Sequence, residues 1–115
     1  METVTVREVA ERHVRAIAEG RISDALADIV EDIRAESEAN LALAAPLVST
    51  AEVERVDVDR DEAVVLLRFV TRSGTQPDVL IESEWWEIDG RPQLVRGRSG
   101  LTALGGWSGW SGWSG

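Results

Sequence analysis

The chain has one histidine, His13, and this is the side chain best suited to proton transfer near neutral pH. It falls on the apolar stripe of a predicted helix, between Val9 and Ile17. Two interpretations follow from this position. In the first, His13 is a hydrogen-bonded residue of the core. In the second, the helix lines a cavity and His13 is the catalytic acid or base, with a carboxylate from the sheet as its partner.

A second group of candidate residues alternates along the last predicted hairpin, around the turn at Asp89-Gly90. If this turn is a bulged three-residue loop, the even-numbered residues share one face: Glu82, Glu84 and Trp86 beside Leu94, Arg96 and Arg98. The opposite, core-like face would then carry Ile81, Ser83, Trp85 and Val95. The charged set forms either a solvated ladder of ion pairs or part of a pocket or subunit interface. A two-residue loop would remove this simple pairing.

The acidic residues predict no metal site. One group is typical of a solvated helix face: Asp28, Glu31, Asp32, Glu36 and Glu38. A second group, Asp57, Asp59, Asp61 and Glu62, surrounds a turn but lacks the ligand spacing and glycine of a calcium loop. The sequence also contains no phosphate-cradling glycine loop, nucleophile elbow or HExxH motif. We therefore expect no cofactor and no metal.

The C-terminal end differs in composition from the rest of the chain. Residues 1–100 are predicted to form the folded domain, and residues 101–115 a linker followed by three Trp-Ser-Gly triplets at Trp107, Trp110 and Trp113. Three interpretations remain open for these tryptophans: an engineered or incidental extension, an aromatic arm that packs on this domain or a neighbour, and a ligand-like tail that enters a pocket.

Composition narrows the class of protein. A length of 115 residues allows one domain with a core of its own, and the absence of cysteine excludes disulfides and thiolate metal sites. The net charge of −9 argues against a nucleic-acid partner. The first twenty residues contain no long apolar run, so we expect neither a signal peptide nor a membrane span, and a cytoplasmic location.

The N-terminal half is predicted to be helical. Thr5 and Glu8 are spaced as a capping box for the first helix, and Gly20 is a natural residue for its C-terminal end. A second helix is predicted after Ser23, with an apolar stripe formed by Leu26, Ile29, Val30 and Ile33. A third helical stretch runs over about residues 35–44, before Pro46.

The C-terminal half is predicted to form four antiparallel strands, over about residues 52–58, 63–72, 78–88 and 92–98. A bulge is expected in the first strand, where Val53, Val56 and Val58 break the alternation. The second strand is apolar on both faces, which indicates a central strand whose second face is also covered. Helices followed by a strand meander predict an α+β fold, with the N-terminal helices packed on a curved antiparallel sheet.

The helical half, the segment Gly20-Arg-Ile-Ser-Asp-Ala-Leu and the sheet segment from Ser83 to Pro92 together resemble the NTF2-like (SnoaL-like) superfamily, over about residues 4–98. The resemblance implies a cone-shaped, cystatin-like fold that encloses a pocket and often pairs through the outer face of its sheet. Members of the superfamily include isomerases, dehydratases, cyclases, epoxide hydrolases and binding modules. The pocket tyrosines of ketosteroid isomerases and scytalone dehydratases have no counterpart, because this chain contains no tyrosine.

Three functional hypotheses follow. The first is a small homodimer that binds an apolar small molecule or serves as an interaction module, without demonstrated catalysis. The second is a cofactor-free isomerase, cyclase or hydrolase, in which His13 is the acid or base and Glu84 or Arg96 orients the substrate. In the third, the domain is a scaffold that displays the tryptophan tail.

Overall fold

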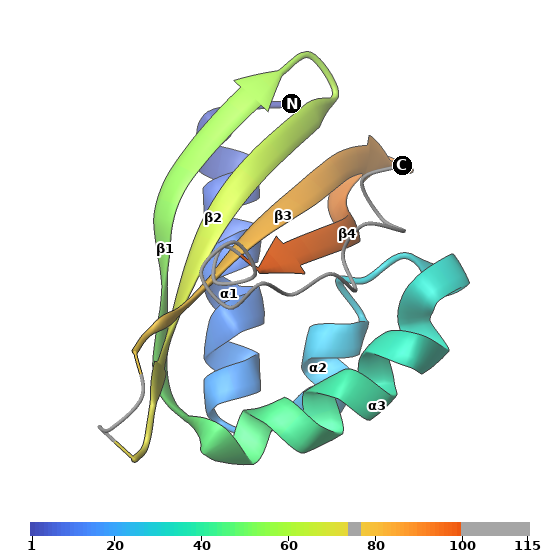
Figure 1. Ribbon diagram of the computed structural model, residues 1–115. Coiled ribbons are helices and arrows are strands. Elements are labelled where there is room, and N and C mark those ends of the chain that lie inside the picture. Colours follow the sequence, from blue (N-terminus) through green and yellow to red (C-terminus); the bar gives the residue numbers. More distant parts are fainter. Residues whose placement is uncertain (74–76, 100–115) are drawn as a thin grey trace.

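The computed structural model describes residues 1–73 and 77–99 (Figure 1). The helices come first: α1 (Thr3–Ala18), α2 (Ile22–Leu26) and α3 (Arg34–Ala44). The strands follow: β1 (Val48–Asp59), β2 (Glu62–Thr71), β3 (Val79–Ile88) and β4 (Arg91–Ser99). They form one antiparallel sheet in the order β1-β2-β3-β4, so the predicted α+β class is confirmed. Helix α1 runs along one face of the curved sheet, and α2 and α3 lie together near one end of α1.

The inner face of the sheet is the face that packs against α1. Strand β2 contributes Ala63, Val65, Leu67 and Phe69 to it, all of them buried as their alternation predicts. Trp85 of β3 is fully buried on the same face. The predicted bulge in β1 is also present, as a register shift between Val53 and Arg55. The core of the domain therefore lies between α1 and the inner face.

The β3–β4 turn differs from its prediction. Ile88 pairs directly with Arg91, so the loop has two residues instead of three. Its residues Asp89 and Gly90 both have positive φ, 54° and 79°, as a type I′ turn requires. A bulge further along the hairpin shifts the register, because Glu84 pairs with Arg96 whereas Trp85 pairs with Leu94. The inner face consequently carries Leu94 opposite Trp85, in place of the predicted Val95.

Helix α1 ends as predicted but begins differently. Gly20 has a φ of 77°, and its N–H donates to the carbonyl of Ile17 while that of Arg21 donates to the carbonyl of Ala16. These two bonds form a Schellman motif. The predicted capping box at Thr5 and Glu8 is wrong, because the helix already begins at Thr3 and its N-cap residue makes no side-chain capping bond.

The second predicted helix stops early. Helix α2 ends at Leu26, and the chain then runs beside β4 in an isolated parallel bridge between Ile29 and Leu94. The N–H of Leu94 donates to the carbonyl of Asp28 (2.8 Å), and the N–H of Val30 donates to the carbonyl of Leu94 (2.9 Å). These backbone bonds replace helical ones, so the predicted stripe from Leu26 to Ile33 is not one helix face. Helix α3 then covers the predicted stretch 35–44.

Candidate functional site

His13 lies in the core, on the face of α1 that packs against the sheet. Its side chain is 3% exposed, and its ring meets the indole of Trp85 edge to face, with 5.4 Å between the ring centroids. The Trp85 indole N–H donates to Ser83 Oγ (2.9 Å), and that hydroxyl donates to the carbonyl of Val65 (2.7 Å). The aromatic pair and its hydroxyl partner thus form one connected layer of the core.

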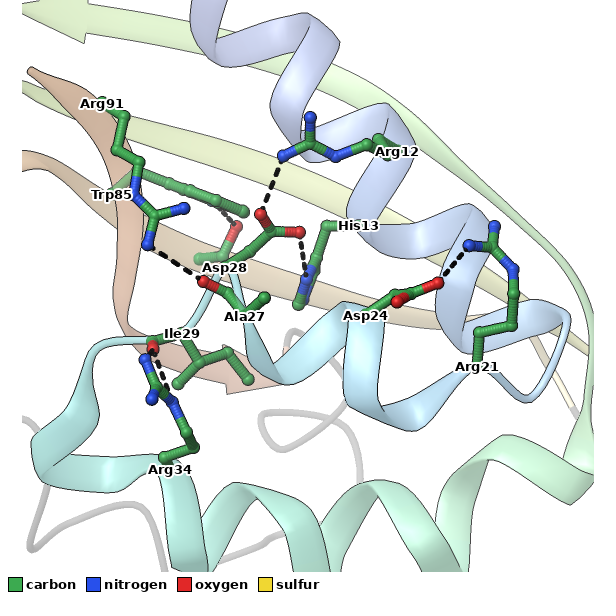
Figure 2. A network of polar contacts seen from close by, with 11 residues as sticks. Arg12, His13, Arg21, Asp24, Ala27, Asp28, Ile29, Arg34, Trp85 and Arg91 are labelled. Carbon is green, nitrogen blue, oxygen red and sulfur yellow. Dashed lines mark hydrogen bonds and ion pairs between the residues drawn. The ribbon is translucent and has the colours of Figure 1, made fainter.

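The acidic partner of His13 is Asp28, in the segment that follows α2. His13 Nδ1 lies 3.4 Å from Asp28 Oδ2, although no aligned hydrogen bond joins this nitrogen to any described residue. On the other carboxylate oxygen, Arg12 Nη2 donates to Asp28 Oδ1 at 2.9 Å (Figure 2). Burial by itself would raise the pKa of Asp28, but the contacts with His13 and Arg12 outweigh it and hold that pKa below its ordinary value.

Two expectations about these acidic residues are corrected here. Asp28 is 3% exposed and does not belong to a solvated helix face, whereas Glu31, Asp32, Glu36 and Glu38 are exposed as predicted. The predicted partner of His13 was a carboxylate from the sheet, but Asp28 belongs to the segment after α2 that runs beside β4. The cause is the early end of α2: the backbone bonds between residues 28–30 and Leu94 turn Asp28 inward toward α1.

The charged hairpin residues lie on the outer face of the sheet, which is the face turned away from α1. Arg98 Nη2 donates to Glu82 Oε1 (2.8 Å), and Arg96 Nε lies 3.4 Å from Glu84 Oε1. The Trp86 indole N–H donates to Glu84 Oε2 (2.6 Å). Both predicted Glu–Arg pairs form, because the bulge compensates for the shorter turn.

The sheet separates the two groups of candidate residues. Glu84 and Trp85 are successive residues of β3, so their side chains point to opposite faces, and Trp85 is the one that contacts His13. Glu84 and Arg96 therefore lie across the sheet from His13. The enzyme hypothesis places these residues around one substrate, and the geometry does not bring them together.

The outer face also carries an apolar stripe. We define it as Val64, Leu66 and Val70 of β2 with Leu80 and Trp86 of β3, all on the outer side by their register. Val64 is 37% exposed and Trp86 is 38% exposed, and the other three side chains are half-buried. Charged side chains lie between its members: Arg68 falls between Leu66 and Val70 on β2, and it pairs with Glu54 and with Asp78.

The remaining candidates fall beyond the part of the chain that the structure describes. Trp107, Trp110 and Trp113, and the proposed domain boundary near residue 100, lie outside the described residues. Within residues 1–73 and 77–99, no three acidic or histidine side chains gather as metal ligands. In the same ranges, no helix is both long enough and apolar enough to cross a membrane.

Two solved structures have an architecture similar to that of this chain. A crystal structure of a protein of unknown function from Nostoc punctiforme, described as having a cystatin-like fold, superposes with a TM-score of 0.64 at 14% identity, covering 84% of this chain and 87% of that one. The solution structure of a SEC-C motif containing protein from Rhodopseudomonas palustris superposes with a TM-score of 0.59 at 14% identity, covering 72% of this chain and 69% of that one. The fold is cystatin-like. No protein-family model and no curated protein sequence matches the chain.

Within this cystatin-like fold, Asp28 and Arg12 are the residues that sequence reasoning did not single out. Arg12 directly precedes His13 on α1, and Asp28 lies two residues after the end of α2. The sequence gives no local sign of the buried position of Asp28, because no glycine or proline marks the end of α2. The apparent helical stripe concealed it, because that stripe placed Asp28 on the solvent side.

Proposed function

We propose that the protein is a homodimeric interaction module of the NTF2-like type, which pairs with a second copy through the outer face of its sheet. The observation that carries this proposal is the apolar stripe from Val64 to Trp86, on the face that none of the described helices covers. An exposed apolar patch bordered by polar groups is typical of a protein–protein contact. A face that meets its own copy around a two-fold axis would bury the stripe against itself.

The charges around the stripe support this use of the face. A charge that is buried without a partner costs several kcal/mol, so interfaces tolerate charges best when they are already paired. Glu82 is paired with Arg98 and Glu84 is close to Arg96 within one copy. Glu84 lies opposite Val64 and Glu82 opposite Leu66, so these pairs would lie among the stripe residues, and they would fix the register of the two sheets by charge complementarity.

The inner face offers less support for an apolar ligand or for catalysis. The space between α1 and the sheet is filled by large side chains, among them Val14, Leu67 and Trp85, which are each at most 2% exposed. His13 is covered by the same packing and has Glu84 and Arg96 on the far side of the sheet. Of the hypotheses drawn from the sequence, the dimeric interaction module agrees best with this geometry.

The substitution Val64→Arg tests the proposed interface. Val64 on β2 lies opposite Glu84 on β3, so an arginine at position 64 has an oppositely charged neighbour within the monomer. In the dimer, the same arginine would lie in the interface and face the second copy. We expect the wild type to be a dimer in the micromolar range and Val64→Arg to be a folded monomer. Native mass spectrometry measures both states, and it would also reveal a retained small molecule as an added mass.

Two controls separate the sheet face from other surfaces. Leu43→Glu changes an apolar side chain on α3 that is 76% exposed, away from the sheet, and should leave the dimer intact. A chain truncated after Gly105 removes the three terminal tryptophans and should also stay dimeric. A monomeric wild type would contradict the proposal. A dimer that dissociates only in the truncated chain would instead assign assembly to the tail.

A further inference from the structure

A second surface feature lies between α1, the α2 segment and the start of β4, beside the His13–Asp28 contact. It is a hollow of about 260 Å³, lined by Arg12, Ala16, Arg21, Asp24, Ala27, Asp28 and Arg91. Its walls come from α1, from α2 with its flanking residues, and from the start of β4. Three of the seven lining residues are arginines, in a chain whose net charge is −9. This local gathering of cations therefore runs against the overall charge of the chain.

The ion pairs inside the hollow leave one arginine over. Arg21 Nη1 donates to Asp24 Oδ2 (2.6 Å), and Arg12 Nη2 donates to Asp28 Oδ1 (2.9 Å). Arg91 forms no ion pair with any described residue, and its Nη2 donates one long bond to the carbonyl of Ala27 (3.4 Å). Arg21 also pairs with Glu19, which lies outside the lining (2.8 Å), so Arg91 is the lining arginine without a carboxylate partner among the described residues.

Arg12 and Arg91 reach the same segment from two sides. In Figure 2, Arg12 extends from α1 to the carboxylate of Asp28, and Arg91 extends from β4 to the backbone carbonyl of Ala27. Arg12 uses only Nη2 for its bond to Asp28 within the described part of the chain, and 61% of its side chain is exposed. The N–H groups at Nε and Nη1 of Arg12 and most of those of Arg91 are therefore available to an acceptor that enters the hollow.

We propose that this hollow binds a small molecule bearing an oxyanion group, a carboxylate or a phosphate, between the guanidinium groups of Arg12 and Arg91. A guanidinium presents its donors as a planar fork that matches two oxygens of either group. Asp28, nine-tenths buried and fixed by backbone bonds to β4, holds Arg12 in position and makes one side of this site rigid. The volume admits a small molecule, and the net charge of the chain disfavours a polymeric anion.

The test is a titration of the full chain with sodium succinate and, separately, with sodium phosphate, at constant ionic strength. Nitrogen-edited NMR spectra resolve arginine Nε–Hε signals, and we expect those of Arg12 and Arg91 to shift with one saturable isotherm. Arg91→Gln should weaken binding by about tenfold or more, since it removes a charge-assisted contact, while the bond from Arg91 to the carbonyl of Ala27 is long (3.4 Å). Tighter binding of succinate would assign a carboxylate ligand, and tighter binding of phosphate a phosphate ligand.

Arg55→Gln is the matched control. Arg55 is an arginine on β1 whose side chain is 65% exposed and pairs with Asp57, and it does not line the hollow. Its replacement makes the same change in net charge and should leave the isotherm unchanged. Shifts that do not saturate with either anion would overturn the proposal, as would equal weakening by Arg55→Gln and Arg91→Gln. The oligomeric state, measured in the same samples, reports on the sheet interface independently of this result.

Discussion

Replacement of Trp85 with alanine should lower the free energy of unfolding by about 3–5 kcal/mol. Trp85 is fully buried on the inner face of the sheet, beside the His13 ring and hydrogen-bonded to Ser83 Oγ. The substitution removes the apolar area of the indole, leaves a cavity and takes away the donor to Ser83. Urea unfolding followed by circular dichroism, at one protein concentration, measures the loss without relying on tryptophan fluorescence.

Leu43→Ala is the control for this change. It also truncates a large apolar side chain, but at a position on α3 that is 76% exposed, so the free energy of unfolding should change by less than about 0.5 kcal/mol. The cavity left in Trp85→Ala is also expected to accept added indole, with partial recovery of stability. A loss below about 1 kcal/mol for Trp85→Ala would mean that the inner face is not closely packed, and it would return the apolar-ligand hypothesis to first place.

Local patterns carried enough information to predict the sheet. Strand β2 alternates so regularly that its inner residues, from Ala63 to Phe69, could be named before the fold was known. The Asp89-Gly90 pair marked the last turn, because both positions need positive φ and these residue types tolerate it. Such features depend on the backbone conformation of a few neighbouring residues. A single sequence is therefore sufficient to predict them.

The hairpin shows how a correct pairing can rest on an incorrect turn. Glu82 faces Arg98 and Glu84 faces Arg96, as predicted, but through a two-residue turn and a bulge at Val95. The bulge places Leu94 opposite Trp85, where the core needs an apolar side chain. The buried position of Leu94 beside Trp85, and its backbone bridge to Ile29, favour this shift of one residue. A bulge of this kind depends on contacts between distant segments, which the periodicity of one strand does not record.

The His13–Asp28 contact could not be predicted from the sequence, because it also depends on pairing between distant segments. The pattern of apolar residues after Ser23 fits a helix, and a helix would place Asp28 toward solvent. The chain instead ends α2 at Leu26 and pairs its backbone with Leu94, which is distant in sequence. Tertiary pairing thus overrides a local helical pattern at the position that carries the buried carboxylate. His13 could be named as a candidate, but its partner could not.

Replacement of Asp28 with asparagine should lower the free energy of unfolding at neutral pH by about 1–3 kcal/mol. The isosteric amide keeps the volume but loses the charge that attracts Arg12 and lies beside His13 Nδ1. The pKa of Asp28 is lower in the folded protein than its ordinary value, so the unfolded chain takes up this proton first as the pH falls. The stabilising contribution of Asp28 is therefore present above pH about 3.9 and disappears as the pH falls through the lower folded pKa.

The difference in stability between the wild type and Asp28→Asn should accordingly be large at pH 7 and shrink in strongly acidic solution, which urea unfolding at a series of pH values measures. Asp24→Asn removes the same charge from a side chain that is 61% exposed and paired with Arg21, so it should cost less than about 1 kcal/mol. Equal losses for the two variants at neutral pH would mean that net charge and not the buried contact is responsible. A difference that stays constant into acid would show that Asp28 acts through shape and hydrogen bonding alone, and that its charge does not stabilise the fold.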